Sequence, residues 1–119
     1  MAALLVVEDD PVQRKMMQRL LGLHFAVEAV DQFAALDMDW AGYDVALVDV
    51  LMAVHDGPWL VRNAAERGGV MPIVIFYSAL PVELLQREAL GLDSGAYYYL
   101  SKSGAVSDLV GTIKALCEY

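Results

Sequence analysis

The amino-acid sequence predicts an α/β fold in which helices cover both faces of a five-stranded parallel sheet. Short apolar runs alternate with helical segments five times along 119 residues, and this alternation is typical of a parallel sheet with right-handed crossover connections. The run Tyr43–Asp49 is apolar almost throughout, which favours a strand that is buried on both faces. Acidic, hydroxyl or basic side chains follow four of the five strands, at the edge where open α/β sheets bind their ligands.

Composition and charge indicate one compact, acidic domain spanning residues 1–119. Apolar residues make up 58% of the chain, and the mean hydropathy is +0.45, so a substantial core can be buried. The net charge of -8 argues against a nucleic-acid-binding surface, because the sequence has no cluster of Lys and Arg side chains to replace the counterions of the phosphates. The single cysteine, Cys117, cannot form an internal disulfide. No apolar run is long enough for a signal peptide or a membrane span, and we expect a cytoplasmic protein without membrane contact.

The first half of the chain contains three predicted strands and two predicted helices. Asp10 is suited to cap the first helix, with Pro11 at its first position and Gln13 at the capping-box spacing. One face of this helix is apolar and is expected to pack in the core. Its residues are Val12, Met16, Met17, Leu20 and Leu21. The predicted elements are a strand at Leu4–Val7, a helix from Pro11 to Gly22, a strand at Phe25–Val30, a weak helix at Gln32–Met38 and the strand Tyr43–Asp49.

The second half begins with a loop from Val50 to His55 and the turn Asp56-Gly57-Pro58, which is suited to start a helix. Gly68-Gly69 is a suitable end for that helix. The predicted elements are a helix from Gly57 to Glu66, a strand at Pro72–Tyr77, a helix at Pro81–Leu90, a turn at Gly91–Gly95, a strand at Ala96–Leu100 and a final amphipathic helix at Ala105–Leu116.

Acidic side chains follow two of the buried strands. Glu8 and Asp9 come directly after the first strand, and Asp49 ends the third. Two such carboxylates about 4 Å apart would repel by roughly 4 kcal/mol at an effective dielectric of about 20. We therefore expect a cation among them.

The other two strand ends carry a hydroxyl and an amine. Ser78 follows the fourth strand and Lys102 the fifth. Because the carboxyl ends of parallel strands lie at the same edge of a sheet, these side chains should lie on the same side of the sheet as Asp49.

The order and spacing of these residues resemble those of response-regulator receiver domains, over essentially the whole chain. The resemblance implies a flavodoxin-like (βα)5 three-layer sandwich with strand order 2-1-3-4-5. It also implies a two-component signalling phosphoprotein that catalyses only its own phosphorylation and dephosphorylation and is not otherwise an enzyme. The segments that carry it are Val6–Pro11, Leu47–Asp49 with Asp56-Gly57, Tyr77–Ala79, and Gly95-Ala96 leading to Tyr99 and Lys102.

The resemblance assigns a role to each strand-end residue. It makes Asp49 the phosphoacceptor. Lys102 would pair with Asp49 before the transfer and with a phosphoryl oxygen after it, and Ser78 would donate its hydroxyl to the phosphoryl group. It implies a Mg²⁺ cofactor bound directly by Asp9 and Asp49, by Glu8 through water, and by the backbone carbonyl of Leu51. Oxygen ligands of this kind suit Mg²⁺.

The resemblance also implies a switch and a set of partners. Ser78 and Tyr99 would move together on phosphorylation and alter a face formed by the helix at Val82–Leu90, the Tyr99 strand and the last helix. The expected phosphodonor is a sensor histidine kinase or a phosphotransfer protein. The expected output is a downstream protein target or a fused output domain, with homodimerisation through the same face.

Two departures from the family pattern, and the residues at two further positions, affect these expectations. Ala53 and Ser103 stand where the family usually has proline. A cis peptide bond before a residue other than proline costs about 2.5–4 kcal/mol, so a trans bond is predicted between Lys102 and Ser103. Leu51 and Leu80 are aliphatic at positions that tune phosphoryl lifetime in the family, which predicts slow self-dephosphorylation because neither can orient water.

Two other interpretations remain at this point. A pseudo-receiver would be a phosphorylation-independent docking module whose acidic pocket has lost its role. A flavin or nucleotide carrier on the same fold would need a glycine-rich phosphate loop after the first strand, where this chain has Glu8-Asp9-Asp10. We interpret His55 as a solvated loop residue and not as a metal ligand or phosphoryl relay.

Overall fold

The computed structural model of the protein describes residues 1–79, 97–102, 104 and 106–118. Strands and helices alternate along the chain as predicted, and a short 3-10 helix precedes the third strand. The elements are β1 (Ala3–Val7), α1 (Pro11–Leu21), β2 (Ala26–Val30), α2 (Gln32–Asp37), η1 (Trp40–Gly42), β3 (Val45–Val48), α3 (Gly57–Glu66), β4 (Ile73–Ser78), β5 (Tyr97–Ser101) and α5 (Val106–Cys117).

The five strands form one parallel sheet in the order β2-β1-β3-β4-β5. Both the order and the parallel pairing confirm the prediction. In register, Val7 lies beside Val48, and Ser78 beside Ser101. The residues that follow β1, β3, β4 and β5 therefore meet at one edge of the sheet.

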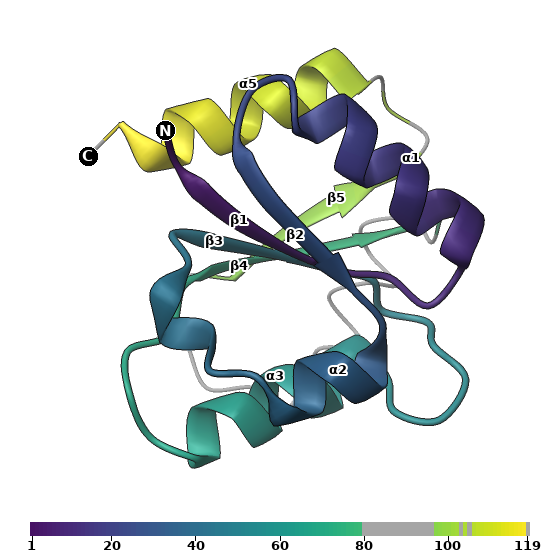
Figure 1. The fold of residues 1–119 in the computed structure, drawn as a ribbon, viewed down its shortest axis with the longest axis vertical. Coiled ribbons are helices and arrows are strands. Elements are labelled where there is room, and N and C mark those ends of the chain that lie inside the picture. The colour runs from purple at the N-terminus through teal and green to yellow at the C-terminus, as the bar shows by residue number, and fades with distance from the viewer. Residues whose placement is uncertain (80–96, 103, 105, 119) are drawn as a thin grey trace.

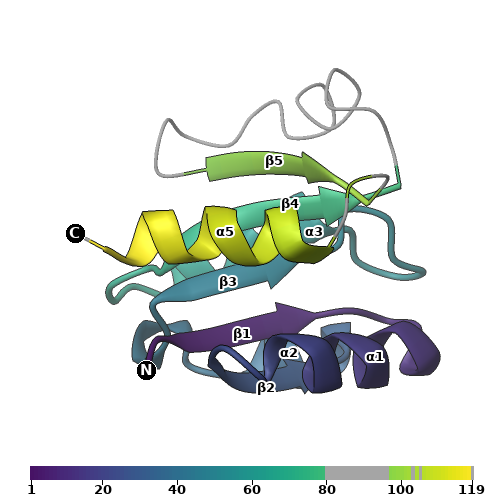
Figure 2. The same ribbon diagram turned by 90° about the horizontal axis from the view of Figure 1, so that it is seen from above.

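Two layers of helices enclose the sheet. Helices α1 and α5 cover one face, and α2 and α3 cover the other (Figures 1 and 2). Each face has its own apolar cluster, and strand side chains enter the two clusters alternately, as with Leu4 and Leu5. Within the described residues, no helix is both long and apolar enough to cross a membrane.

Helix α1 begins as predicted but buries less of its apolar stripe than expected. The Asp10 side chain accepts a hydrogen bond from the Val12 N–H, and Pro11 occupies the first helical position. The capping-box role of Gln13 is wrong, because its side chain accepts a hydrogen bond from Lys102. Val12 is 74% exposed and Met16 49% exposed, so only the part of the stripe that faces the sheet enters the core.

The opposite layer is built from capped helices. Asp31 caps α2 by accepting from Ala34, and Asp56 caps α3 by accepting from the Trp59 N–H. Helix α3 ends before Gly68, whose φ of 82° is in the region that favours glycine. The sequence did not predict η1, whose Trp40 indole N–H donates to a backbone carbonyl in the core.

Four of the predictions fall on residues outside the described ones. These are the position of Leu80 beside the phosphoacceptor site, the helix at Pro81–Leu90, the turn at Gly91–Gly95 and the peptide bond between Lys102 and Ser103. Strand β5 and helix α5, which flank this part of the chain, are present within one residue of their predicted bounds.

Candidate functional site

Asp49 lies immediately after β3, at the carboxyl edge of the sheet. Its backbone N–H donates to the Val7 carbonyl of β1 at 3.1 Å, which continues the ladder between the two central strands. The residue is only 9% exposed. The chain thus places a carboxylate at the inner rim of the sheet with little contact with water.

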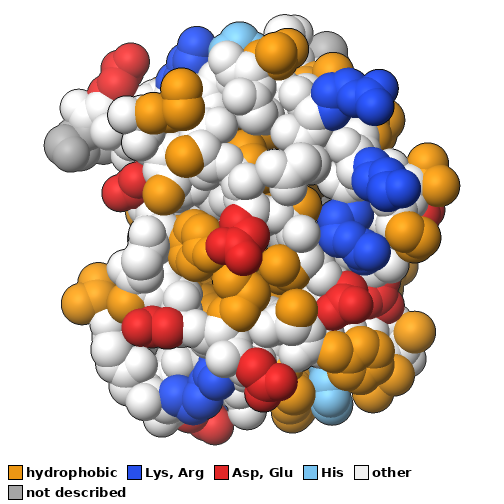
Figure 3. All heavy atoms as spheres, viewed as in Figure 1, with side chains coloured by type: hydrophobic (Ala, Val, Ile, Leu, Met, Phe, Trp, Pro, Cys, Tyr) orange, Lys and Arg blue, Asp and Glu red, His pale blue; other side chains and the backbone are white. Residues whose placement is uncertain are grey.

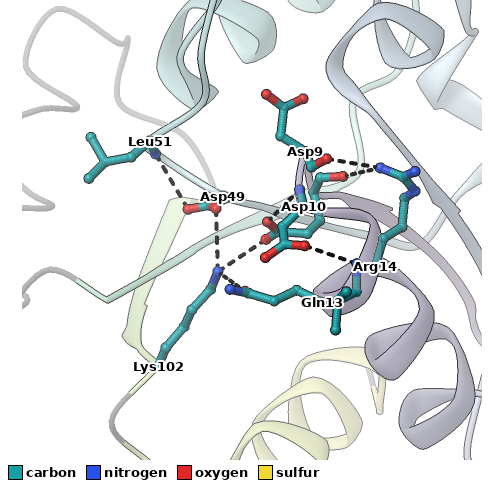
Figure 4. Close-up of polar contacts among 9 residues, drawn as sticks. Asp9, Asp10, Gln13, Arg14, Asp49, Leu51 and Lys102 are labelled. Carbon is teal, nitrogen blue, oxygen red and sulfur yellow. Dashed lines mark hydrogen bonds and ion pairs between the residues drawn. The ribbon is translucent and has the colours of Figure 1, made fainter.

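The Lys102 ammonium joins the strand ends. Its Nζ donates to Glu8 Oε2 at 3.0 Å, to Asp49 Oδ2 at 3.3 Å and to Gln13 Oε1 at 2.8 Å. These three acceptors use all three N–H groups of the ammonium. The predicted contact of Lys102 with Asp49 is therefore present, and Figure 4 shows the lysine between Asp49 and Gln13.

Backbone and ring contacts hold Lys102 in this position. Its N–H donates to the Ser78 carbonyl at 2.7 Å, which ties the end of β5 to the end of β4. The ammonium also lies 5.7 Å from the centre of the Tyr77 ring, a distance at which a cation is attracted to the ring face.

Burial and neighbouring charge shift the pKa values of both partners. Burial, with a further contribution from the Glu8 carboxylate, raises the pKa of Asp49 to about 6, although Lys102 opposes the shift. Burial alone would lower the pKa of Lys102, but the Asp49 and Glu8 carboxylates outweigh that effect and raise it. Lys102 is therefore charged at neutral pH, and Asp49 is mostly ionised.

The sequence led us to expect one cation shared by Glu8, Asp9 and Asp49, but the three carboxylates do not share one partner in the structure. Glu8 and Asp49 share the Lys102 ammonium, so the lysine itself supplies the counter-charge. The Asp9 carboxylate instead accepts from the Gln32 side chain at 2.8 Å and from the Ala53 N–H at 3.2 Å. Among the described residues, no three His, Cys, Asp or Glu side chains form a group arranged to hold a metal.

The donor set nevertheless suits Mg²⁺. In Figure 4 the Lys102 ammonium lies on one side of Asp49, and the Asp9 carboxylate and the Leu51 backbone lie on the other. The Leu51 N–H is 3.4 Å from Asp49 Oδ1, so the loop carrying the predicted carbonyl ligand is adjacent to the carboxylate. Carboxylate and carbonyl oxygens are the ligands that Mg²⁺ prefers. Residues Asp9 and Asp49 would hold the ion directly.

Ser78 and Tyr99 occupy neighbouring strands near this edge. Ser78 is buried at the end of β4. The ring of Tyr99 on β5 stacks on Phe76, its register partner on β4, with 5.7 Å between ring centres. Tyr99 is half-buried against the core under α2 and α3. The structure thus places the two predicted switch residues on adjoining strands.

The Asp56-Gly57 turn brings α3 into contact with the Asp49 backbone. The Gly57 N–H donates to the Val50 carbonyl at 2.9 Å. A Cβ atom on Gly57 would lie 2.3 Å from the Asp49 carbonyl oxygen and 3.1 Å from the Val48 side chain. Only glycine allows α3 to begin this close to the strand that ends in the acid.

Replacing Gly57 with alanine is therefore expected to destabilise the protein by about 1–3 kcal/mol, because a backbone atom must move to admit the methyl group. Chemical denaturation of the two proteins measures this difference. Gly111→Ala is the matched control, since a Cβ there meets nothing within 4 Å and alanine is favoured in a helix by up to about 1 kcal/mol. Equal losses in both variants would contradict the contact.

Sequence reasoning missed three polar residues at the site. Gln13 binds Lys102, and Gln32 binds Asp9. The Arg14 guanidinium donates to the backbone carbonyls of Glu8 and Asp9, which fixes the turn after β1 (Figure 4). The sequence around a glutamine or an arginine does not indicate contacts with residues far along the chain or with backbone carbonyls, so these roles could not be predicted.

The sequence suggested that the His55 side chain is solvated, but the structure places it partly out of solvent. It is half-buried and stacks on Trp59 with 3.9 Å between ring centres. Its backbone N–H donates to the Gln32 side chain at 2.7 Å. Ala53, the departure from the family pattern in the same loop, donates its N–H to Asp9, a contact that proline could not make.

Residues 4–114 match the family described as the response regulator receiver domain, and the chain belongs to this family. The chain is 34% identical over 116 residues to the response regulator MprA of Mycobacterium avium, a match that covers 95% of this chain and 50% of the relative. The chain therefore spans about half the length of the curated relatives it matches. The family is not usually counted among true enzymes.

Solved structures agree on the fold. The chemotaxis protein CheY4 of Vibrio cholerae superposes with a TM-score of 0.75 and 22% identity, covering 98% of both chains. The BeF3-activated receiver domain of DrrB gives a TM-score of 0.77 at 19% identity, covering 100% of this chain and 99% of the other. At these identities the likeness establishes the three-layer α/β architecture alone.

Proposed function

We propose that Asp49 accepts a phosphoryl group, with Mg²⁺ as cofactor, and that this modification switches a protein-interaction face. The observation that carries the proposal is the pairing of a buried Asp49 with the Lys102 ammonium at the carboxyl edge of the sheet. A buried carboxylate with a raised pKa and a charged partner is typical of a reacting group. Membership of the receiver family supports the same role.

In the proposed reaction, Asp49 is the nucleophile. One of its oxygens forms a bond to phosphorus as the bond from phosphorus to the donor breaks, and the donor leaves with its electron pair. From a phosphohistidine donor, the leaving group is the imidazole. Mg²⁺, when bound, neutralises the phosphoryl oxygens. A pKa of about 6 leaves Asp49 largely ionised at neutral pH, as a nucleophile must be.

Lys102 and Ser78 would then stabilise the product. The ammonium already contacts Asp49 Oδ2 at 3.3 Å and would transfer that contact to a phosphoryl oxygen. The Ser78 hydroxyl would donate to another. Movement at Ser78 would reach Tyr99 through β4, since the Tyr99 ring stacks on Phe76, two residues before Ser78. Phosphorylation would thus shift the conformational equilibrium of the face that β5 and α5 form.

The proposed phosphodonor is a sensor histidine kinase or a phosphotransfer protein, and α1 offers it a docking surface. Lys and Arg side chains gather over this helix (Figure 3), which contains Arg14, Lys15 and Arg19. The exposed Val12 and Met16 lie on the same helix. An acidic domain with one basic, partly apolar helix beside its acceptor suits a partner with a complementary helical surface.

A second function, constitutive docking without phosphorylation, is favoured by one observation. Asp9, the expected metal ligand, accepts hydrogen bonds from Gln32 and Ala53 and takes no part in the ion pairs of Lys102 with Glu8 and Asp49. In a pseudo-receiver this arrangement would be permanent. Output through a downstream target, a fused output domain or homodimerisation is compatible with either function.

Incubation with acetyl phosphate and Mg²⁺ separates the two functions. The wild-type protein is expected to gain about 80 Da, the mass of one phosphoryl group, by intact-protein mass spectrometry. Asp49→Asn, which keeps the shape but removes the nucleophile, is expected to gain nothing, and chelation of Mg²⁺ should abolish the wild-type gain. An unmodified wild-type protein at saturating donor would contradict phosphorylation and support constitutive docking.

A further inference from the structure

The amide of Gln32, the first residue of α2, is fully buried at 0% exposure. Both of its polar atoms have partners. Nε2 donates to Asp9 Oδ2 at 2.8 Å, and Oε1 accepts from the His55 N–H at 2.7 Å. Burial of an amide is costly unless it is hydrogen-bonded, so these contacts define one orientation of the side chain.

The two contacts of Gln32 join segments that are far apart in the chain. Asp9 belongs to the turn after β1, and His55 to the loop that leads from Asp49 to α3. The ring of His55 stacks on Trp59 of α3. Gln32 therefore links Asp9 to the loop beside the acceptor, in addition to the direct hydrogen bond from the Ala53 N–H of that loop to Asp9.

The two carboxylate oxygens of Asp9 differ in their hydrogen bonds. Oδ2 accepts from Gln32 Nε2 and from the Ala53 N–H, which occupies both of its lone pairs. Within the described part of the chain, Oδ1 accepts no hydrogen bond. One oxygen of the carboxylate is thus fixed by two donors, and the other is left for a cation.

We propose that Gln32 is a positioning residue for the metal site, which fixes Asp9 through Oδ2 so that Oδ1 can bind Mg²⁺. This inference rests on the proposed function, because it assumes that Asp9 is a ligand. Hydrogen-bonding partners of metal-ligating carboxylates orient them, and removal of such partners typically weakens metal affinity about 10–100-fold. None of the roles given above to Asp49, Lys102 or Ser78 requires Gln32.

The test is a Mg²⁺ titration of ¹⁵N-labelled protein without a phosphodonor, followed by NMR. Gln32→Met keeps the volume of the buried side chain and removes both hydrogen bonds, and its Kd is expected to rise at least about tenfold. The matched control is Gln18→Met. Gln18 also bridges two polar groups, the Val27 carbonyl and the Ala29 N–H, but is exposed and makes no contact with Asp9, so its Kd should stay within about twofold of wild type.

The outcomes separate this inference from the proposed function. If wild type and Gln32→Met bind Mg²⁺ equally, or if the variant binds more tightly, the positioning role is overturned while the cofactor remains. If wild-type protein and Gln18→Met bind no Mg²⁺, the proposed cofactor and the positioning role are both overturned.

A second measurement uses the wild-type protein alone, in case Gln32→Met fails to fold. The side-chain amide resonances of Gln32 are expected to shift on Mg²⁺ addition, with the same Kd as the backbone resonances of Asp9 and His55. Side-chain resonances that stay unchanged while the Asp9 resonance saturates would overturn the inference.

Discussion

Replacing Lys102 with methionine is expected to lower the free energy of unfolding by about 3 kcal/mol in metal-free protein at neutral pH. The substitution leaves the buried carboxylates of Glu8 and Asp49 together without their shared cation. Methionine retains most of the side-chain volume, so the loss reports on charge. Urea denaturation followed by circular dichroism measures the effect.

Two further variants test whether this loss of stability arises from removal of the positive charge. Lys15→Met removes an exposed lysine from α1 and should change stability by no more than about 0.5 kcal/mol. Adding Asp49→Asn to Lys102→Met should recover part of the loss, because one of the two repelling acids is then neutral. A Lys102→Met protein as stable as wild type would show that the ammonium contributes no net stabilisation.

Asp49→Asn alone is expected to stabilise the metal-free protein by about 1–2 kcal/mol at about pH 8, a value reduced from the full linkage effect because solvent screens part of it. Folding raises the pKa of Asp49 from 3.8 to about 6, mainly through burial. An acid whose pKa is raised on folding favours the folded state below its unfolded pKa, and this contribution is lost as the pH rises through the folded pKa.

The gain from Asp49→Asn should therefore shrink between about pH 6 and pH 4, where the wild-type carboxyl becomes protonated in the folded state while it is still largely ionised in the unfolded state. Saturating Mg²⁺ is expected to stabilise wild type at about pH 8 and to have less effect on the variant, because binding to the folded state alone raises stability. A gain that is independent of pH would show that the raised pKa of Asp49 is not its cause.

The fold class and the sheet edge that carries the site followed from local features of the sequence, whereas the strand order was implied by the resemblance to receiver domains. Continuous apolar runs such as Val45–Val48 identify buried strands, and strand ends identify the sheet edge. Because all five strands are parallel, Asp49 and Lys102 at the strand ends were predicted to lie at one edge of the sheet, and the resemblance to receiver domains supplied the prediction that they are in contact. Capping aspartates such as Asp10 and Asp56 were equally predictable, since the contact lies within three residues.

The rest of the site depends on contacts with no local signature. Gln13 meets Lys102 across 89 residues, and Gln32 meets Asp9 across 23. A glutamine in a helix is most often solvent-exposed, so its residue type did not predict burial. The orientation of Asp9 was missed for the same reason, because it is set by Gln32 and the Ala53 N–H and not by its neighbours.

The exposed face of α1 shows a different limit of sequence reasoning. Val12 and Met16 continue the apolar stripe of Met17 and Leu21, and periodicity alone places all four in the core. The sheet covers only part of that stripe, and Val12 and Met16 remain in solvent. Periodicity identifies an amphipathic helix but not how much of its apolar face the fold covers.

Chemical localisation of the phosphoryl group tests the central claim most directly. After reaction with acetyl phosphate and Mg²⁺, borohydride reduction converts an aspartyl phosphate to homoserine, which peptide fragmentation by mass spectrometry assigns to a single residue. We predict homoserine at position 49, in wild type and not in Asp49→Asn. Homoserine at Asp9, at any other aspartate, or at none would contradict the assignment of Asp49 as the phosphoacceptor.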